Sequence, residues 1–375
     1  MASAMNLPAY RHAADADSAM LRAIAERAGQ ADAHGQGLAA ETALLREAGW
    51  LTRCLPPGEN GDGWGCSPEG TEPAMAALRR LGRVSLPTAR LFEGHMNAVK
   101  LVALYATPAG RTRAFARVRE GAMLGVWGAD DPADPVRLER DGDTLRLHGT
   151  KRFASGLGDI ALAVVTAVAP GGGTQLLLVP VDEPERADPS GWRMAGMRAT
   201  RSGAYRLDGL RVTADDLLGA PDDYYREPHF EGGIWRYCAA HLGGAEALYA
   251  ATRDTLLARG RASDPHQETR IVAAAVAVET ARLWIERAAR AVEAADAPPD
   301  AMLLALLARE VTDGCCREVL GIVERALGMA AHEDGTAIER TRRDLSLFVC
   351  QAAPDAKRSR AARALVAVAA LPEAW

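Results

Sequence analysis

The sequence is poor in lysine, and its positive charge comes almost entirely from arginine. Of 44 basic residues in a chain of 375, only Lys100, Lys151 and Lys357 are lysine. The basic residues are scattered among 49 acidic ones, and the formal net charge is −5. Nucleic acids and membrane surfaces bind proteins through concentrated positive charge. The charge distribution therefore argues against either kind of partner.

Long apolar runs are also missing. The longest of them, Ile160 to Ala169 and Leu365 to Leu371, are much shorter than the roughly 20 residues that cross a bilayer. The first residues of the chain contain no basic segment followed by an apolar core, which is the pattern of a secretory signal. We therefore expect a cytoplasmic protein without membrane spans.

Cysteine is sparse, with six residues that form no CxxC pair, and no two histidines stand at metal-ligand spacing. The composition thus predicts neither a disulfide framework nor a metal site. What is present is typical of a globular protein: 48% of the residues are hydrophobic and 25% are charged. A chain of this length suits two or three packed units.

The hydrophobic pattern changes its period twice along the chain. Apolar residues recur at helical spacing up to about residue 119, as at Met20 and Ile24. Short alternating runs separated by turn compositions follow, and then long helical stretches return. We predict an α+β fold with an N-terminal helical domain (1–119), a middle antiparallel β-barrel or sandwich domain (120–220) and a C-terminal four-helix bundle (221–375).

Several short segments occur in a characteristic order. They are LGVWGADD at Leu124 to Asp131, GTKRFASG at Gly149 to Gly156, MRAT at Met197 to Thr200, LLG at Leu217 to Gly219, and the pair Arg343 and Asp344. In this order they resemble motifs of the acyl-CoA dehydrogenase superfamily, and the resemblance covers nearly the whole chain. It implies the three-domain fold described above and an FAD cofactor.

The resemblance also implies which residues contact the flavin. A flavin needs an aromatic or apolar wall, donors for its ring and cations for its pyrophosphate. Trp127 and Phe153 match the wall, and Ser155 stands where the family supplies a hydroxyl near N5. Taken alone, an aromatic residue on a strand is usually a core residue. The other cofactor contacts that we predict are Ala129, Arg259, Arg261, Arg325 and Gly328, with Arg259 or Arg261 reaching a neighbouring subunit's pyrophosphate.

The catalytic glutamate of the family is missing from both of its usual positions. These positions correspond to about Ala352 and about Trp235. Removal of an α-proton next to a thioester requires a carboxylate within hydrogen-bond reach. Asp355 and Glu231 are nearby substitutes, although a solvated loop carboxylate explains either of them. We predict Asp355 as a catalytic candidate.

A second catalytic candidate is His95, in the sequence FEGHMN. It resembles the histidine that superfamily monooxygenases of the dibenzothiophene type place in the substrate pocket. A histidine there can orient a polar substrate or donate a proton. A buried helix histidine bonded to a carbonyl explains the residue equally well.

Three functions follow from these observations. The leading one is an FAD-dependent oxidoreductase that oxidises an acyl thioester or a related activated carbon acid, a small-molecule substrate, with an electron acceptor that the sequence does not specify. The second is a flavin monooxygenase or oxidase on the same fold, which His95 and the missing glutamate favour. The third is a flavin-poor structural or binding paralogue.

We also predict self-association. The stretch Ile271 to Ile285 is apolar on more than one face, and such a surface is poorly satisfied on a monomer. We expect a homodimer or a homotetramer.

Overall fold

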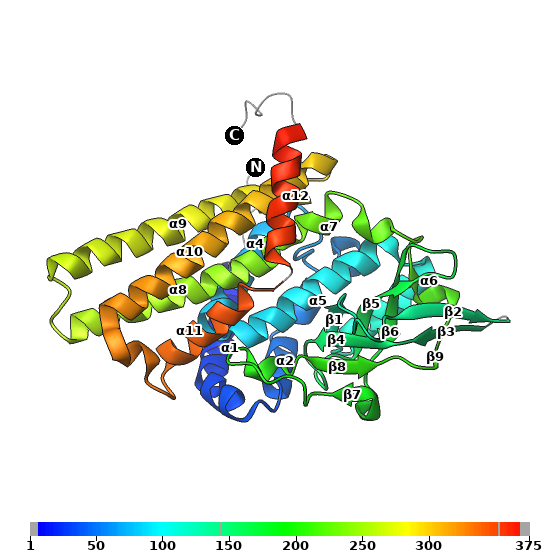
Figure 1. The fold of residues 1–375 in the computed structure, drawn as a ribbon, viewed down its shortest axis with the longest axis horizontal. Helices are drawn as coiled ribbons and strands as arrows, with labels where there is room; N and C mark the ends of the chain where they lie inside the picture. The colour runs from blue at the N-terminus through cyan, green and yellow to red at the C-terminus, as the bar shows by residue number, and fades with distance from the viewer. Residues whose placement is uncertain (1–6, 143, 352, 368–375) are drawn as a thin grey trace.

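The computed structural model describes residues 7–142, 144–351 and 353–367, and the chain forms helices, then strands, then helices again (Figure 1). The N-terminal part contains α1 (Leu7–His34), α2 (Ala39–Glu47), α3 (Trp50–Arg53), α4 (Thr71–Val84), α5 (Leu86–Tyr105) and α6 (Pro108–Arg119). Helix α5 is largely buried and begins with a cap, because the Ser85 hydroxyl accepts the Thr88 N–H. Pro87 lies in its first turn, where a missing N–H costs nothing.

The middle of the chain forms two sheets. The larger one, seven-stranded within the described residues, follows the order β10-β6-β5-β2-β3-β9 with β1 beside β5, and the smaller one follows β4-β8-β7. The strands are β1 (Leu124–Trp127), β2 (Arg137–Asp141), β3 (Thr144–His148), β4 (Thr150–Ala154), β5 (Leu162–Val168), β6 (Thr174–Pro180), β7 (Ala187–Asp188), β8 (Gly203–Arg206), β9 (Leu210–Val212) and β10 (Leu217–Leu218).

The sheets differ in one detail from the antiparallel arrangement that we predicted. β1 pairs with β5 in parallel, with Leu124 opposite Leu162, and β2 meets β5 through a parallel pair, Arg137 and Val168. The chain between β1 and β5 makes an excursion through β2, β3 and β4 and returns in the same direction. Such a crossover is what parallel neighbours require.

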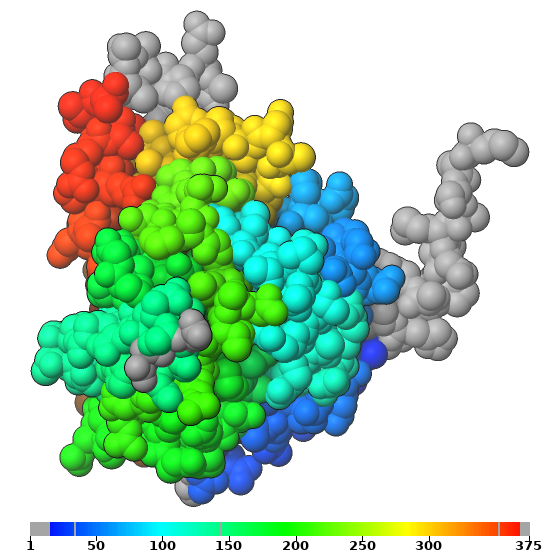
Figure 2. Space-filling model, turned by 90° about the vertical axis from the view of Figure 1, so that its right-hand side faces the viewer, coloured from blue at the N-terminus to red at the C-terminus, as the bar shows by residue number. Residues whose placement is uncertain are grey.

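The C-terminal part is again helical: α7 (His229–Gly232), α8 (Ile234–Ala258), α9 (Pro265–Glu293), α10 (Met302–Leu327), α11 (Ala337–Phe348) and α12 (Pro354–Ala367). Helices α8, α9 and α10 lie side by side, and α12 stands at the molecular surface (Figures 1 and 2). In the described residues we find no helix that is both long and apolar enough to cross a membrane. The predicted α+β fold class is confirmed.

The N-terminal helix α4 packs along α8 at very short range. A Cβ atom at Gly82 would lie 2.3 Å from the carbonyl oxygen of Ala240, and one at Gly243 would lie 2.3 Å from that of Arg79. Only glycine permits this approach of two helix backbones. The first helices are therefore locked onto the C-terminal bundle.

A buried carboxyl joins helix α11 to the β domain. Asp344 is 3% exposed and accepts a 2.5 Å hydrogen bond from the Met197 N–H. The neighbouring Arg343 pairs with Asp32 of α1 at 2.7 Å. Burial raises the pKa of Asp344 to about 7, although the Met197 N–H acts in the opposite direction. The motif RD thus holds three parts of the chain together.

The raised pKa of Asp344 predicts a pH-dependent stability. Because the folded-state pKa lies above the unfolded value, the protonated carboxyl favours folding, and this contribution is lost as the pH rises through about 7. Asp344→Asn keeps an acceptor for Met197 but cannot ionise. Between pH 5 and pH 8 we expect the parent to lose about 1–3 kcal/mol more than this variant, measured by urea unfolding. Asp300→Asn, a change at an exposed site, is the control. Its free energy of unfolding should fall between pH 5 and pH 8 by the same amount as that of the parent.

Candidate active site

A cavity of about 1090 Å³ lies where the β domain meets the helices. Its walls come from β1, β4 and the following loops, from α5, and from the segment of η5 (Asp223–Tyr225), α7 and the start of α8. The end of α11 and the first turns of α12 complete it. A cavity of this size between domains is typical of a site for a cofactor or a small molecule.

The β-domain wall is aromatic. The Trp127 indole is 2% exposed, packs on Tyr205 with ring centroids 5.4 Å apart, and donates from Nε1 to the Ser155 carbonyl at 3.0 Å. Phe153 is 50% exposed and meets Trp192 edge to face at 6.4 Å. Its φ of 53° lies in the left-handed region, which a phenylalanine rarely adopts. A fixed indole and an exposed phenyl ring thus face the cavity.

Beside this wall lies a chain of hydroxyl groups. Ser202 donates to the Ser155 hydroxyl at 2.8 Å and lies 2.7 Å from the Thr200 hydroxyl. Thr200 donates in turn to the Met197 carbonyl at 2.8 Å. All three hydroxyl residues line the cavity. The chain fixes the Ser155 oxygen, and the Ser155 proton, which makes a long 3.5 Å contact with the Phe153 carbonyl, can turn toward a ligand.

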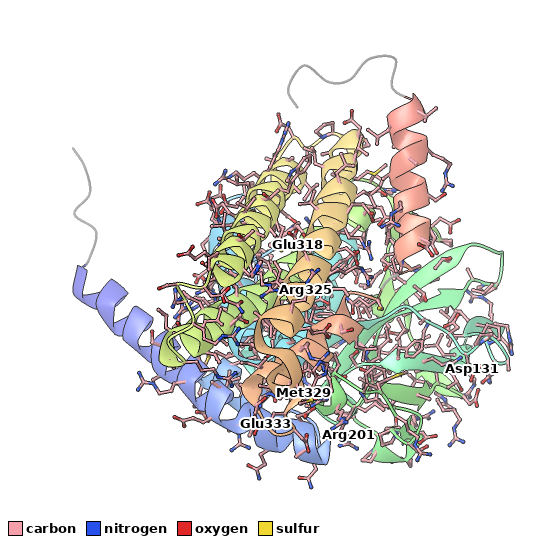
Figure 3. The ribbon with its side chains drawn as sticks, turned by 60° about the vertical axis from the view of Figure 1, so that its left-hand side comes forward. Asp131, Arg201, Glu318, Arg325, Met329 and Glu333 are labelled. Carbon is pink, nitrogen blue, oxygen red and sulfur yellow. The ribbon has the colours of Figure 1, made fainter. Side chains whose placement is uncertain are left out.

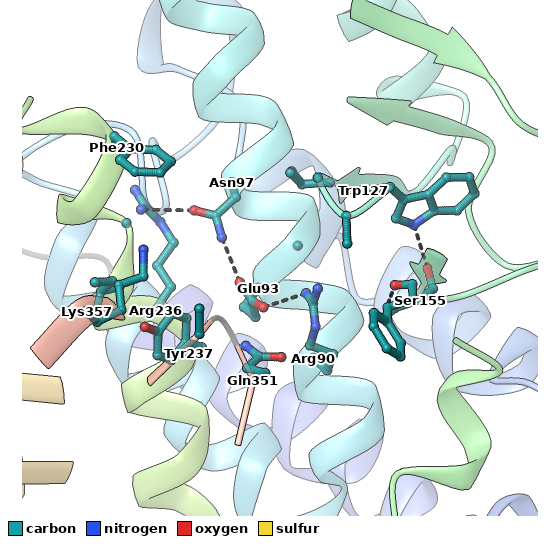
Figure 4. A pocket seen from close by; sticks show the side chains of 18 of the residues that line it. Arg90, Glu93, Asn97, Trp127, Ser155, Phe230, Arg236, Tyr237, Gln351 and Lys357 are labelled. Atoms are coloured by element: carbon teal, nitrogen blue, oxygen red, sulfur yellow. Dashed lines mark hydrogen bonds and ion pairs between the residues drawn. The ribbon is translucent and has the colours of Figure 1, made fainter. Parts of the chain in front are cut away.

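The floor of the cavity is a row of charged and polar side chains between α5 and α8 (Figure 4). Glu93 is 2% exposed and accepts from Arg90 at 2.5 Å and from Asn97 at 2.7 Å. The Asn97 amide oxygen accepts from Arg236 at 3.2 Å, and Arg236 pairs with Glu293 of α9 at 2.7 Å. Each buried charge therefore has a partner, as burial requires.

Burial and pairing act against each other in this row. Burial raises the pKa of the Glu93 carboxyl and lowers the pKa of the Lys100 ammonium. For Glu293, burial acts to raise the pKa, but Arg236 and Lys100 together bring it below its usual value. Lys100 Nζ lies 2.6 Å from Glu293. Glu293 therefore stays ionised, while Glu93 holds its proton to higher pH than a free glutamate.

The end of the cavity away from the β domain is closed by α12. Lys357 pairs with Glu231, and Arg360 pairs with Glu231 at 3.1 Å and with Glu227 at 2.5 Å. Both cations lie over the Phe230 ring, at 4.9 Å and 5.7 Å from its centroid. Ion pairs and cation–π contacts thus hold α12 against α7.

The structure puts His95 outside the cavity lining. The residue is fully buried, its Nε2 donates to the Leu51 carbonyl at 3.0 Å, and its Nδ1 accepts the Leu124 N–H at 3.0 Å. Burial lowers its pKa to about 4, so the ring is neutral. Both ring nitrogens are used to join α5 to the α3 helix and to β1. The structure therefore supports the packing interpretation of this histidine, and not the catalytic one.

Of the other predicted site residues, some line the cavity and some lie outside it. Trp127, Ala129, Phe153 and Ser155 line the cavity together. Asp355 is exposed and lies outside the lining, which argues against its catalytic assignment. The other predicted contacts are at bundle ends, outside the lining: Arg259 and Arg261 between α8 and α9, and Arg325 and Gly328 at the end of α10. Ala352 lies outside the described residues.

Sequence reasoning missed the polar floor. Arg90, Glu93 and Asn97 stand three and four residues apart, the spacing that places side chains on one helix face. That spacing could have predicted the α5 part of the floor. Arg236 and Glu293 lie on other helices, α8 and α9, and no local sequence pattern links them to it. Among the described residues we find no cluster of three histidine, cysteine or carboxylate side chains that could hold a metal.

Comparison with known proteins adds independent findings. The chain is 26% identical over 305 residues to a probable FMNH2-dependent monooxygenase, SfnC, of Pseudomonas putida, covering 74% of this chain and 73% of the relative. It is 24% identical over 295 residues to the mitochondrial isobutyryl-CoA dehydrogenase of Dictyostelium discoideum, covering 72% and 69%. No family model matches.

A solved structure supports the fold. TdsC of Paenibacillus sp. A11-2, in a complex with FMN and indole, superposes with a TM-score of 0.81 at 21% identity and covers 95% of this chain and 97% of that one. The fold and these relatives define a class, the flavin-dependent oxidoreductases of the acyl-CoA dehydrogenase fold. These relatives support the superfamily that the motifs predicted, the acyl-CoA dehydrogenase superfamily.

The two buried hydrogen bonds of His95 predict a stability effect. His95→Leu should lower the free energy of unfolding by about 2–4 kcal/mol, because the Leu51 carbonyl and the Leu124 N–H lose their side-chain partner. Urea unfolding measures this loss. A variant as stable as the parent but unable to bind flavin would contradict the packing interpretation.

Proposed function

We propose that the protein is a flavin-dependent monooxygenase that uses FMN and oxidises a small organic molecule. The observation that carries the proposal is the cavity lining. Among the residues that the structure describes, two carboxylates line it, and each of them is already engaged: Glu93 with Arg90 and Asn97, and Glu231 with Lys357 and Arg360. A dehydrogenase of this fold needs a free carboxylate base beside the substrate carbon.

The second dehydrogenase position supports the same conclusion. Trp235 stands where a glutamate would begin the first bundle helix, and its Nε1 donates to Glu293 at 3.0 Å. The indole is fully buried in the bundle. Our leading sequence hypothesis, oxidation of an acyl thioester, therefore gives way to its alternative. The curated monooxygenase relative agrees with this choice.

The residues present fit a flavin ring. Trp127 and Phe153 would cover the ring, and the Ser155 hydroxyl, which accepts from Ser202, would donate to its polar edge. We predicted FAD, but the arginines expected on its pyrophosphate lie outside the cavity lining of this chain. FMN lacks the adenylate half and needs no such contact here. TdsC is described with FMN, which supports FMN for this chain.

Within this proposal each group of residues has a task. A bound reduced flavin would supply the electrons with which molecular oxygen is activated. The hydroxyl chain fixes the Ser155 oxygen at the ring edge. Glu93 lies between the two ends of the cavity floor, and burial raises the pKa of its carboxyl.

The function can be tested directly. Purified protein is mixed with chemically reduced FMN, ¹⁸O-labelled oxygen and, in separate samples, indole or 2-naphthoate, and the products are analysed by mass spectrometry. We expect one labelled oxygen atom in the product of at least one of these two compounds. A parallel anaerobic sample with oxidised FMN and isobutyryl-CoA should not bleach. Bleaching without oxygen would favour dehydrogenation and contradict the proposal.

Ser155 offers a test of the flavin site. Ser155→Ala removes one hydrogen bond, worth about 0.5–1.5 kcal/mol, so FMN affinity should fall by at most roughly tenfold. Ser155→Leu should weaken FMN clearly more, because a bulky side chain enters the cavity. Quenching of FMN fluorescence measures both. Ser190→Ala, at an exposed site of the same domain, should bind FMN like the parent, and equal affinity in every variant would reject this assignment.

We also propose that the chain self-associates through its bundle. Along α9, Val272, Val276 and Leu283 are 62%, 60% and 53% exposed, and Met329 beyond α10 is 91% exposed. Figure 3 draws Met329 near the end of α10, below Arg325. Exposed apolar side chains of this size along one helix favour a protein interface. Association there would also allow Arg259 or Arg261 to approach a neighbour.

The interface proposal predicts the effect of added charge. Val272→Asp combined with Val276→Asp should convert a dimer or tetramer to monomers, because an interface that buries these side chains would then bury unpaired carboxylates. Light scattering after size exclusion measures the mass. Arg253→Asp, an exposed change on α8, is the control. A monomeric parent at micromolar concentration would exclude the proposal.

A further inference from the structure

We infer that the cavity takes an organic molecule with an oxyanion group, which lies at the α12 end while an apolar body reaches toward the β domain. The inference rests on the proposed function, because it names the substrate class of the same cavity. It follows from three features of the lining: its charge, its apolar side chains, and the position of the α12 cations and of Trp127 at opposite ends.

The charge of the lining is positive. Its cationic side chains are Arg90, Lys100, Arg152, Arg236, Lys357, Arg360 and Arg363. Five of these seven cations pair with four carboxylates, namely Glu93, Glu227, Glu231 and Glu293. Three positive charges therefore remain in excess around one concave site. A cleft lined by one sign of charge concentrates ligands of the other sign.

Part of the excess lies on α12. Lys357, Arg360 and Arg363 follow one another at intervals of three residues, and all of them line the cavity. The first two neutralise Glu227 and Glu231. Arg363 donates only to the Ser359 hydroxyl, at 3.0 Å, and forms no ion pair within the ranges that the structure describes. Its guanidinium can therefore bind an oxyanion without breaking an existing pair.

The cavity lining also contains apolar side chains. Leu101 and Leu104 of α5 face it together with Phe230 and Ile234, and Phe348 closes it from α11. Leu104 is 39% exposed, which is high for a leucine in a helix that is otherwise largely buried. A ligand that covers these side chains gains apolar contact. The occupant therefore needs an apolar body as well as a charge.

The cations of α12 and the proposed flavin residues lie at opposite ends. Figure 4 shows Trp127 and Ser155 on one side of the α5 helix and Lys357 and Phe230 on the other, with Glu93 between them. A flavin ring against Trp127 leaves the α12 end open for the substrate. Two kinds of molecule carry the required oxyanion: a small carboxylic or sulfonic acid, and a thioester whose carrier bears phosphates.

The test compares isosteric probes. Binding of 2-naphthoate and of 2-naphthamide to the full-length protein is measured by isothermal titration, with coenzyme A as a third probe. We expect 2-naphthoate to bind at least about tenfold more tightly than the amide, and this preference to shrink as NaCl is raised. Strong binding by coenzyme A alone would also support the oxyanion site, and would identify the source as carrier phosphates.

A charge-reversal pair locates the site. Arg363→Glu should weaken naphthoate roughly tenfold and leave naphthamide unchanged. Arg358→Glu is the matched control on the same helix, because Arg358 pairs with Glu310 and lies outside the lining. The control changes the net charge equally and should weaken naphthoate by no more than about twofold.

Several outcomes would overturn the inference. The first is that the parent binds 2-naphthoate and 2-naphthamide equally and does not bind coenzyme A. The second is that Arg363→Glu and Arg358→Glu weaken naphthoate binding equally. The third is that Arg363→Glu loses as much affinity for FMN as for naphthoate. The last result would assign Arg363 to the flavin phosphate. Failure of the parent to bind FMN would instead reject the proposed function. The two failures can be distinguished, because the naphthoate titration contains no flavin.

Discussion

The ion pair between Arg236 and Glu293 is the interaction on which the rest of the site depends. It joins α8 to α9, and the Arg236 guanidinium also contacts the Gly65 carbonyl and Asn97. Both charged side chains are almost wholly buried. Removal of one member of such a pair leaves the other charge uncompensated and costs several kcal/mol. The pair therefore fixes where α5, α8, α9 and the loop around Gly65 meet, and so where the cavity floor lies.

The β-domain side of the cavity depends on backbone geometry instead. Phe153 and Met197 both adopt positive φ, and both line the cavity. Met197 is held by the buried Asp344 carboxyl, and its own carbonyl accepts the Thr200 hydroxyl. Helix α11 thus reaches the hydroxyl chain through a single hydrogen-bonded residue. Strained backbone of this kind persists only where the surroundings fix it.

The sequence predicted the fold well and the site unevenly. Helical and alternating periods are local signals, so the order of helices and strands could be predicted, and the superfamily followed from motifs such as GTKRFASG. Trp127 and Ser155 belong to those motifs and line the cavity together. His95 was ambiguous, because a sequence does not reveal that two backbone groups occupy its nitrogens. Arg236 and Glu293 are far apart in the chain, and only tertiary packing brings them together.

The glycine contact between α4 and α8 has a consequence for how the chain can vary. At Gly82 and at Gly243 a methyl group would meet a backbone carbonyl, which cannot rotate away as a side chain can. Both positions lie where α4 crosses α8. A side chain at either glycine would clash with the backbone of the other helix, whichever residue stands at the second position. Substitution is therefore restricted at two positions that lie outside the cavity lining. Substitutions in the loops and cavity walls do not change this contact, so the distance between α4 and α8 is kept while those other regions vary in sequence.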